Sequence, residues 1–377
     1  MHEFRNPYEI RRSTRLKFAA AVFALVNLSP VQESRAADDT LSSGNKNQMM
    51  IYGIVTRTLL YADDGDRNEL FHVDGGVENT RVGWIAQGRL NEDVTAGAHI
   101  EMDLQLSNAA GDVNLIGTES TEQTAWGIRI QEVTATHRRW GKVSLGQGDT
   151  ASTDRVTVDL SGTDLATGNN PADMAGGIHF YNKTTGARAI TIGDVIDKDD
   201  RLRYDFPEVG GAGLSLSYVA GGNWDVGLGY AREWGNFEFE MGAYYANVSA
   251  RSDDDEDLWG GAGSFKHKSG LSFTLTGAVK GRKTIGLDNA DYLWGKIGYS
   301  AALFDAGETH FGVSYGQYND FAQVGDEATS LGVGAVQDLE SIGSNLWILV
   351  RNHELDRAGN DDFDDIFIVS TGVLFNF

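Results

Sequence analysis

Residues 271–279 read Leu271-Ser-Phe-Thr-Leu-Thr-Gly-Ala-Val279, a stretch in which apolar side chains occupy the odd positions and Ser272, Thr274 and Thr276 lie opposite them. Successive side chains of a β-strand point to opposite faces, so this alternation predicts a strand with one apolar and one polar face. The stretch Phe237-Glu-Phe-Glu-Met-Gly-Ala-Tyr-Tyr245 repeats the pattern. Helix signals are nearly absent from the chain.

The same period of two continues through almost every segment after residue 49 and divides the chain into about sixteen strands. Many of these segments exceed the roughly 9–11 residues that a strand needs to cross a membrane. Short connections alternate with long polar ones, such as residues 62–76, as in outer-membrane barrels with tight turns on one side and longer loops on the other. We therefore expect an all-β fold, a transmembrane antiparallel β-barrel of about 16 strands. The expected strands are 50–62, 78–91, 94–107, 125–140, 142–149, 200–207, 213–220, 223–233, 237–250, 258–267, 271–283, 291–304, 309–321, 329–339, 346–357 and 363–377.

A soluble β-sandwich or an extracellular β-helix is the alternative fold. Both predict strands of about five residues and more frequent turns. The long segments favour a closed barrel, because closure removes the exposed edges of so long a sheet.

Composition excludes several classes of protein. The 377 residues include no cysteine, which rules out a disulfide framework and thiolate metal sites. The formal charge of −23 argues against nucleic-acid binding, which needs a basic face. The mean hydropathy of −0.30 resembles that of a soluble protein, but a barrel wall with one polar face gives the same average.

Residues 1–36 have the pattern of a secretory signal peptide. Basic residues precede the apolar run Phe18–Leu28, and Ser34-Arg35-Ala36 offers small residues for cleavage after Ala36. A membrane anchor is the alternative, but eleven helical residues span only about 16 Å of a roughly 30 Å hydrocarbon core. Cleavage would leave residues 37–377 with 25 basic and 51 acidic residues, a formal charge of −26. No later window holds 18 uninterrupted apolar residues.

The C-terminus alternates and closes on an aromatic residue. Phe377, Phe375 and Val373 share one face, and Asn376 and Gly372 lie opposite. This ending resembles the C-terminal signal that the assembly machinery of outer-membrane proteins reads. An ordinary edge strand that finishes on phenylalanine is the alternative.

Several stretches, taken in chain order, resemble the Gram-negative general porins, and with Phe377 the resemblance spans the whole mature chain. The family implies a barrel in the outer membrane of a Gram-negative bacterium that forms a homotrimer through aromatic and small residues of its first and last strands. The chain departs from the family pattern at Trp84, Gln147 and Phe206. The stretches are Ile51-Tyr-Gly53, Asn79-Thr-Arg-Val-Gly-Trp-Ile-Ala-Gln-Gly-Arg-Leu90 with Asn91-Glu-Asp-Val-Thr-Ala-Gly97, Trp140-Gly-Lys-Val-Ser-Leu-Gly-Gln147 and Arg203-Tyr-Asp-Phe-Pro-Glu-Val-Gly-Gly211.

Residues 149–200 form an outsized connection between two expected strands. A loop of this length is normally functional. Its position matches the third loop of the porin family, which folds into the lumen and forms the constriction. Alternatively, it covers the barrel mouth or adds a strand near Gly177–Tyr181.

Charged residues at a constriction set the ion preference of a pore. The acidic candidates on the loop are Asp154, Asp159, Asp164 and Asp173. Opposite them, the porin resemblance implies a basic cluster on the wall. Arg81 falls on the family's second-strand arginine position, alternation places Arg89 on the same face, and Arg57 faces the lumen if Tyr52, Ile54 and Leu60 meet lipid. Arg129 and Arg203 complete the basic set.

No motif indicates an enzyme, a cofactor or a metal site. The chain lacks a Gly-x-Ser-x-Gly elbow opening onto a helix and a His-Glu-x-x-His pair. The acidic runs Asp253–Asp257 and Asp361–Asp365 match no EF-hand spacing, so a solvated loop is preferred over a divalent-cation site.

The sequence thus predicts an outer-membrane porin for passive diffusion of ions and small hydrophilic solutes. Its expected partners are outer-membrane lipid and lipopolysaccharide, its own copies and those solutes, and not nucleic acid. A substrate-selective channel on the same barrel, or a partner-binding barrel with incidental conduction, are the alternatives.

Overall fold

The computed structural model describes residues 47–103, 109–116, 127–153, 155–183, 188–189, 198–250, 252, 255–283, 288–321, 323–359 and 362–377. The predicted signal peptide, residues 1–36, and Asp154 lie outside these residues.

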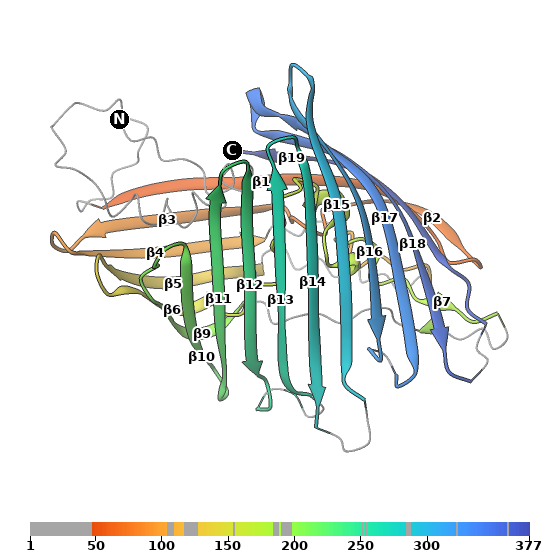
Figure 1. Ribbon diagram of the computed structural model, residues 1–377, viewed down its shortest axis with the longest axis horizontal. Helices are drawn as coiled ribbons and strands as arrows, with labels where there is room; N and C mark the ends of the chain where they lie inside the picture. The colour runs from red at the N-terminus through yellow and green to blue at the C-terminus, as the bar shows by residue number, and fades with distance from the viewer. Residues whose placement is uncertain are drawn as a thin grey trace.

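Sixteen antiparallel strands close into a barrel, as the alternation predicts (Figure 1). The ring closes through β1, which pairs with β3 over Gln48–Ile54 and with β19 over Ile54–Asp63. Each of the sixteen expected segments overlaps one ring strand. The ring strands are β1 (Gln48–Asp63), β3 (Arg81–Arg89), β4 (Val94–Asp103), β5 (Gly127–His137), β6 (Gly141–Asp149), β9 (Lys198–Asp205), β10 (Ala212–Val219), β11 (Asn223–Trp234), β12 (Phe237–Asn247), β13 (Asp255–His267), β14 (Leu271–Arg282), β15 (Ala290–Phe304), β16 (Gly307–Asn319), β17 (Asp326–Leu339), β18 (Ser344–Arg357) and β19 (Ile366–Asn376).

One short strand lies beside β1 where the sequence predicts a polar loop. Strand β2 (Asn68–Val73) folds back on the last six residues of β1, from Asn68 opposite Asp63 to Val73 opposite Thr58. The prediction of a long loop over residues 62–76 is therefore wrong in its middle. Phe71 and Val73 are buried and join the apolar cluster inside the barrel, which holds this strand against β1. Their alternation with His72 was the signal for it.

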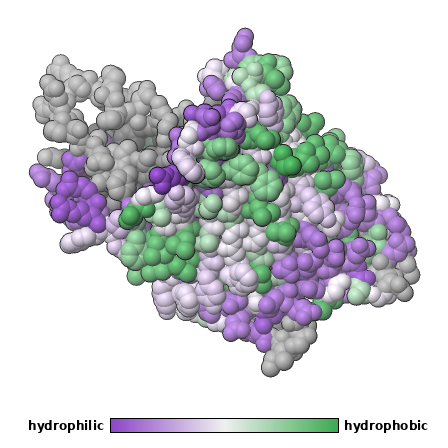
Figure 2. Space-filling view, in the orientation of Figure 1, coloured by the Kyte–Doolittle hydropathy of each residue, from purple (hydrophilic) through white to green (hydrophobic). Residues whose placement is uncertain are grey.

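Apart from the inner faces of β1, β18 and β19, which carry the apolar cluster, the wall is polar inside and apolar outside. In β14, Ser272, Thr274 and Thr276 are each 1% exposed, whereas Phe273 and Leu275 are 40% and 46% exposed. A soluble protein shows the reverse, with apolar side chains buried. Hydrophobic residues run across the visible wall, and hydrophilic residues gather toward its edges (Figure 2). This inversion is the arrangement of a barrel whose outer face meets lipid and whose inner face meets water.

The first and last strands meet at the C-terminus. Gly53 and Phe377 exchange two backbone hydrogen bonds of 2.9 and 3.0 Å. A Cβ on Gly53 would lie 2.3 Å from the Phe377 ring, so only glycine lets the ring lie flat there. Phe377, Phe375 and Val373 share one face, as expected, and are exposed on the outside of the barrel. Their role as an assembly signal stays a prediction.

Among the residues that the structure describes, helical structure is confined to three short turns, α2 (Asp164–Thr167), η2 (Pro171–Asp173) and η3 (Glu340–Ile342). Within the described residues, no helix is long and apolar enough to cross a membrane.

Candidate pore constriction

The third loop, residues 150–197, connects β6 to β9, and its described residues 150–153 and 155–183 lie along the inner wall of the barrel. The Ala151 amide donates to Ser217 Oγ of β10 (2.7 Å), and the Leu160 amide donates to Ser264 Oγ of β13 (3.0 Å). Further along, Ser370 Oγ of β19 donates to Met174 Sδ at 3.7 Å. The loop therefore follows the inside of the wall from β10 to β19. Near the end of the loop, β7 (Phe180–Tyr181) and β8 (Arg188–Ala189) pair in a separate two-stranded sheet that is not part of the ring. Strand β7 overlaps the strand that was considered as an alternative near Gly177–Tyr181.

Glycines in the wall allow the loop to approach closely. A Cβ on Gly227 of β11 would lie 1.9 Å from the carbonyl oxygen of Ala151, and one on Gly242 of β12 would lie 2.2 Å from that of Arg155. Real Cβ atoms cannot be this close to a backbone oxygen. The wall thus lacks side chains where the loop backbone lies on it.

A buried ion pair fixes the middle of the loop. Asp159 accepts hydrogen bonds from Thr274 Oγ1 (2.9 Å) and Ser161 Oγ (2.8 Å), and it pairs with Lys296 of β15. Lys296 also donates to Thr163 Oγ1 at 3.0 Å, and its side chain is fully buried. Asp159 was expected to face the lumen, but its carboxylate is directed at the wall. A buried carboxylate needs a cation and hydrogen-bond donors, and the wall supplies both.

The other two acidic candidates that the structure describes are less enclosed. Asp164 lies 3.8 Å from Lys296 Nζ, and its side chain is 34% exposed. Asp173 is partly exposed and accepts a hydrogen bond of 2.9 Å from Asn170 Nδ2. Among the described residues of the loop, Asp164 and Asp173 are the acids that are partly exposed.

Two of the predicted arginines share one carboxylate on the opposite wall. Glu101 of β4 lies 3.5 Å from Arg81 Nε of β3 and 2.8 Å from Arg129 Nε of β5. Arg81 also pairs with Glu78, and Arg129 lies 3.5 Å from Asp103. The expected basic cluster is therefore a cluster of paired charges.

A second group of arginines clamps the base of the third loop. Arg203 pairs with Asp205 (2.7 Å) and donates to the carbonyl oxygen of Thr150 (2.8 Å). Arg201, which sequence reasoning missed, pairs with Glu132 and donates to the carbonyl oxygen of Asp149 at 2.9 Å. Its position two residues before Arg203 places both side chains on the inward face of β9.

Arg57 does not have the surroundings that were expected. Tyr52, Ile54 and Leu60 are buried inside the barrel, so the premise that they meet lipid is wrong. Arg57 belongs to the alternation of Val55 and Leu59, which are 44% and 49% exposed. The reason is that the apolar cluster beneath the third loop covers the inner face of β1, so both faces of this strand are apolar.

Arg89 shares the face of Arg81 but lies far from it. Eight residues separate them on β3, which corresponds to about 26 Å along an extended strand. Arg89 is exposed at the turn end of the strand. The two residues therefore do not belong to one cluster.

The third loop returns to the barrel mouth beside the connection between β18 and β19. The Lys183 amide donates to the carbonyl oxygen of Asp362, and the Asp364 amide donates to that of Tyr181, both at 2.9 Å. Lys183 Nζ lies 2.9 Å from Asp364 Oδ1. The hydrogen bond to Asp364 raises the pKa of the Lys183 ammonium group, which keeps this exposed tie charged.

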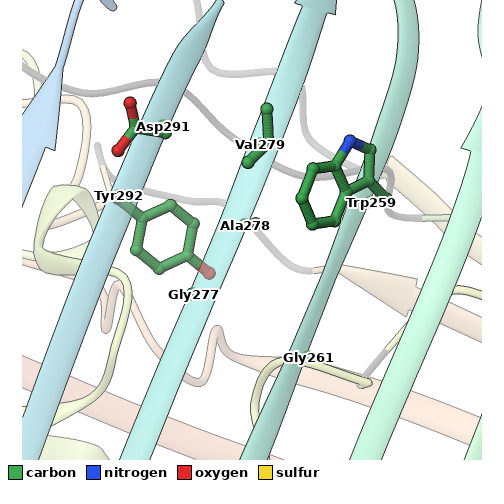
Figure 3. A pocket seen from close by; sticks show the side chains of 7 residues that line it. All are labelled: Trp259, Gly261, Gly277, Ala278, Val279, Asp291 and Tyr292. Atoms are coloured by element: carbon green, nitrogen blue, oxygen red, sulfur yellow. The ribbon is translucent and has the colours of Figure 1, made fainter.

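A shallow groove of about 450 Å³ lies elsewhere, on β13, β14 and β15 (Figure 3). Gly261 and Gly277 contribute no side chain to it, and Trp259, half exposed on the outward face, lines one side. The groove belongs to the outer wall and not to the constriction. In the described part of the chain, no group of three or more histidine or acidic residues is placed to hold a metal ion; the two acidic runs lie partly outside that part.

Comparison with known proteins identifies the family of this barrel. A family model described as Gram-negative porin matches residues 19–345. The chain belongs to the Gram-negative porin family. No curated protein matches the chain.

Solved porin-like structures share the fold of this porin. OmpT of Vibrio cholerae is 13% identical with a TM-score of 0.57, over 90% of this chain and 100% of that one. An anion-selective porin from Comamonas acidovorans is 15% identical with a TM-score of 0.56, over 88% of this chain and 100% of that one. Salmonella typhi OmpF is 16% identical with a TM-score of 0.55, over 88% of this chain and 98% of that one. The family and the fold are those of an outer-membrane diffusion channel.

Proposed function

We propose that the third loop and the charged wall of β3–β9 form the neck of this porin, through which ions and small hydrophilic solutes diffuse passively. A ring of sixteen strands encloses a lumen too wide for side chains to fill. The series of hydrogen bonds from the third loop to the inner wall between β10 and β19 carries the proposal, because it keeps the loop inside the lumen.

The neck has a weak charge preference. Each of Arg81, Arg129 and Arg203 has a carboxylate within 3.5 Å, so the wall presents neutralised pairs instead of a positive face. Asp164 and Asp173 on the loop then leave a small excess of negative charge. We therefore expect slight cation selectivity and sorting mainly by size.

The remaining parts of the proposal concern export and assembly. Residues 1–36 act as a cleaved signal peptide, and the mature chain 37–377 inserts among outer-membrane lipid and lipopolysaccharide. The printed description of one structural neighbour, Vibrio cholerae OmpT, names a trimer form. We propose that this chain also forms a homotrimer and that the barrel performs no catalysis.

The test is liposome swelling with sugars of increasing size, together with single-channel recordings. Wild-type protein should admit monosaccharides rapidly and larger sugars progressively slowly, without saturation, and should conduct in steps of three. A variant lacking residues 164–174 should lose the dependence on size. Saturable flux of one solute would replace this proposal with a substrate-selective channel. A folded, heat-modifiable barrel that does not conduct would contradict it.

A further inference from the structure

A buried arginine beneath the third loop lacks the carboxylate that its counterparts have. Three arginines are buried among the residues that the structure describes: Arg81, Arg201 and Arg351. Arg81 pairs with Glu78 and Glu101, and Arg201 pairs with Glu132. Arg351 of β18 forms no ion pair with any described residue, and its Nε atom has no hydrogen-bond partner.

Two further side chains also have a buried polar atom without a hydrogen-bond partner. Tyr318 Oη of β16 and His353 Nδ1 of β18 are buried and have no hydrogen-bond partner. The exposed fractions of Tyr318, Arg351 and His353 are 2%, 2% and 5%. Arg351 and His353 lie two residues apart on the inward face of β18, and Tyr318 lies on β16, which only β17 separates from β18.

Strand β17 lies between β16 and β18 and carries small residues opposite Arg351 and His353. Gly332 and Ser330 of β17 lie opposite Arg351 and His353, and Arg351 Nε is 3.1 Å from the position that a Cβ on Gly332 would take. A Cβ on Gly316 of β16 would lie 2.7 Å from Tyr318 Oη. Small residues of β16 and β17 therefore separate the three polar groups on the inner wall.

A buried guanidinium is costly unless it is paired and hydrogen-bonded. Asp173 of the third loop interacts with Arg351 electrostatically but forms no ion pair with it. The Arg351 Nε–H and the Tyr318 hydroxyl are donors, and a neutral His353 donates when its proton is on Nδ1. These hydrogen-bond donors, together with the unpaired positive charge of Arg351, are the groups that bind an anion.

The surroundings restrict the size of that anion. The apolar cluster beneath the third loop includes Met174, Tyr318 and Leu355, so the site is enclosed by loop and wall. We propose that Tyr318, Arg351 and His353 bind a small monovalent inorganic anion of the chloride class between β16, β18 and the third loop. The bound anion balances the charge of Arg351 and helps to hold the loop on the wall.

The experiment uses the complete mature porin in detergent, with bromide as a probe. In crystals grown in sodium bromide, we expect an anomalous difference peak in contact with Arg351 Nε. In solution, the midpoint of heat unfolding should rise in sodium chloride relative to sodium gluconate of equal ionic strength. Above the dissociation constant, the rise should be about 2 °C for each tenfold increase in chloride.

Arg357 provides a matched control on the same strand. It binds both carboxylate oxygens of Asp326, at 2.6 and 2.7 Å. Arg351→Gln should abolish the chloride dependence, whereas Arg357→Gln should lower the midpoint and keep that dependence. A wild-type protein with no bromide peak and no chloride dependence would overturn the proposal. So would a chloride dependence that Arg351→Gln retains.

Discussion

The two halves of the barrel wall satisfy their inward polar groups in different ways. From β10 to β19, hydroxyl groups and Lys296 bind the third loop, and glycines let its backbone lie close. From β3 to β9, inward carboxylates and guanidinium groups bind one another. Small polar residues suit a surface that another segment covers. Paired charges suit the other surface, where Arg81, Glu101 and Arg201 are buried and each ion therefore needs a partner.

The largest expected effect follows from breaking the ion pair on the covered half. Lys296→Met leaves Asp159 buried without a cation, which should cost about 3–5 kcal/mol of folding free energy. We also expect unstable, noisier conductance because the loop loses its central contact. Thermal unfolding and single-channel recording measure both effects.

The double variant Lys296→Met/Asp159→Asn serves as the control for that change. It removes both charges, so much of the lost stability should return. If the single and double variants are equally unstable, the pair does not hold the loop.

The next effect concerns selectivity on the opposite half. Glu101→Gln removes the carboxylate that Arg81 and Arg129 share, and the loss of one negative charge should shift the reversal potential in a potassium chloride gradient toward anion preference. Glu354→Gln makes the same charge change at an exposed position near the mouth, and should shift the potential far less. Equal shifts for the two variants would place the selective site outside the neck.

A smaller effect is expected at the base of the loop. Arg203→Met removes one of the two arginines that clamp the strand ends there, but Arg201 keeps its bonds to the carbonyl oxygens of Asp149 and Gly146. The conductance should change only slightly, and the single-channel steps should remain well defined. Arg201→Met serves as the comparison. Arg201 is more deeply buried than Arg203, so its replacement should destabilise the barrel more.

The smallest effect is expected at the mouth. Lys183→Met removes an exposed tie to Asp364, and exposed ion pairs contribute little. Because the pKa of Lys183 is raised, the tie is charged at neutral pH and is lost only as the pH rises beyond the ordinary lysine range. Conductance of wild type and variant should therefore agree between pH 6 and 9. A large difference in that range would show that the mouth controls the neck.

The sequence was sufficient for the ring of strands but not for the inner face. Alternation in stretches such as 271–279 reveals which side chains share a face, and lipid outside with water inside makes that pattern regular. On β1 the pattern fails, because the third loop covers the inner face with apolar residues and Arg57 falls on the outward face. Lys296 was identifiable as the lone cation on the polar face of β15. Its partner Asp159 was not, since a loop of some fifty residues has no period that shows where it lies.

The position of the third loop on the wall is the central claim, and a cross-link tests it directly. The chain contains no cysteine, and a Cβ on Gly312 of β16 would lie 3.2 Å from the Cβ of Thr163, close to the roughly 3.5–4.5 Å of a disulfide. The measurement is single-channel conductance of Thr163→Cys/Gly312→Cys under oxidising and reducing conditions. We predict that the disulfide forms readily and that conductance is the same in both states. Failure of the folded protein to cross-link, or a conductance that changes when the loop is locked, would contradict it.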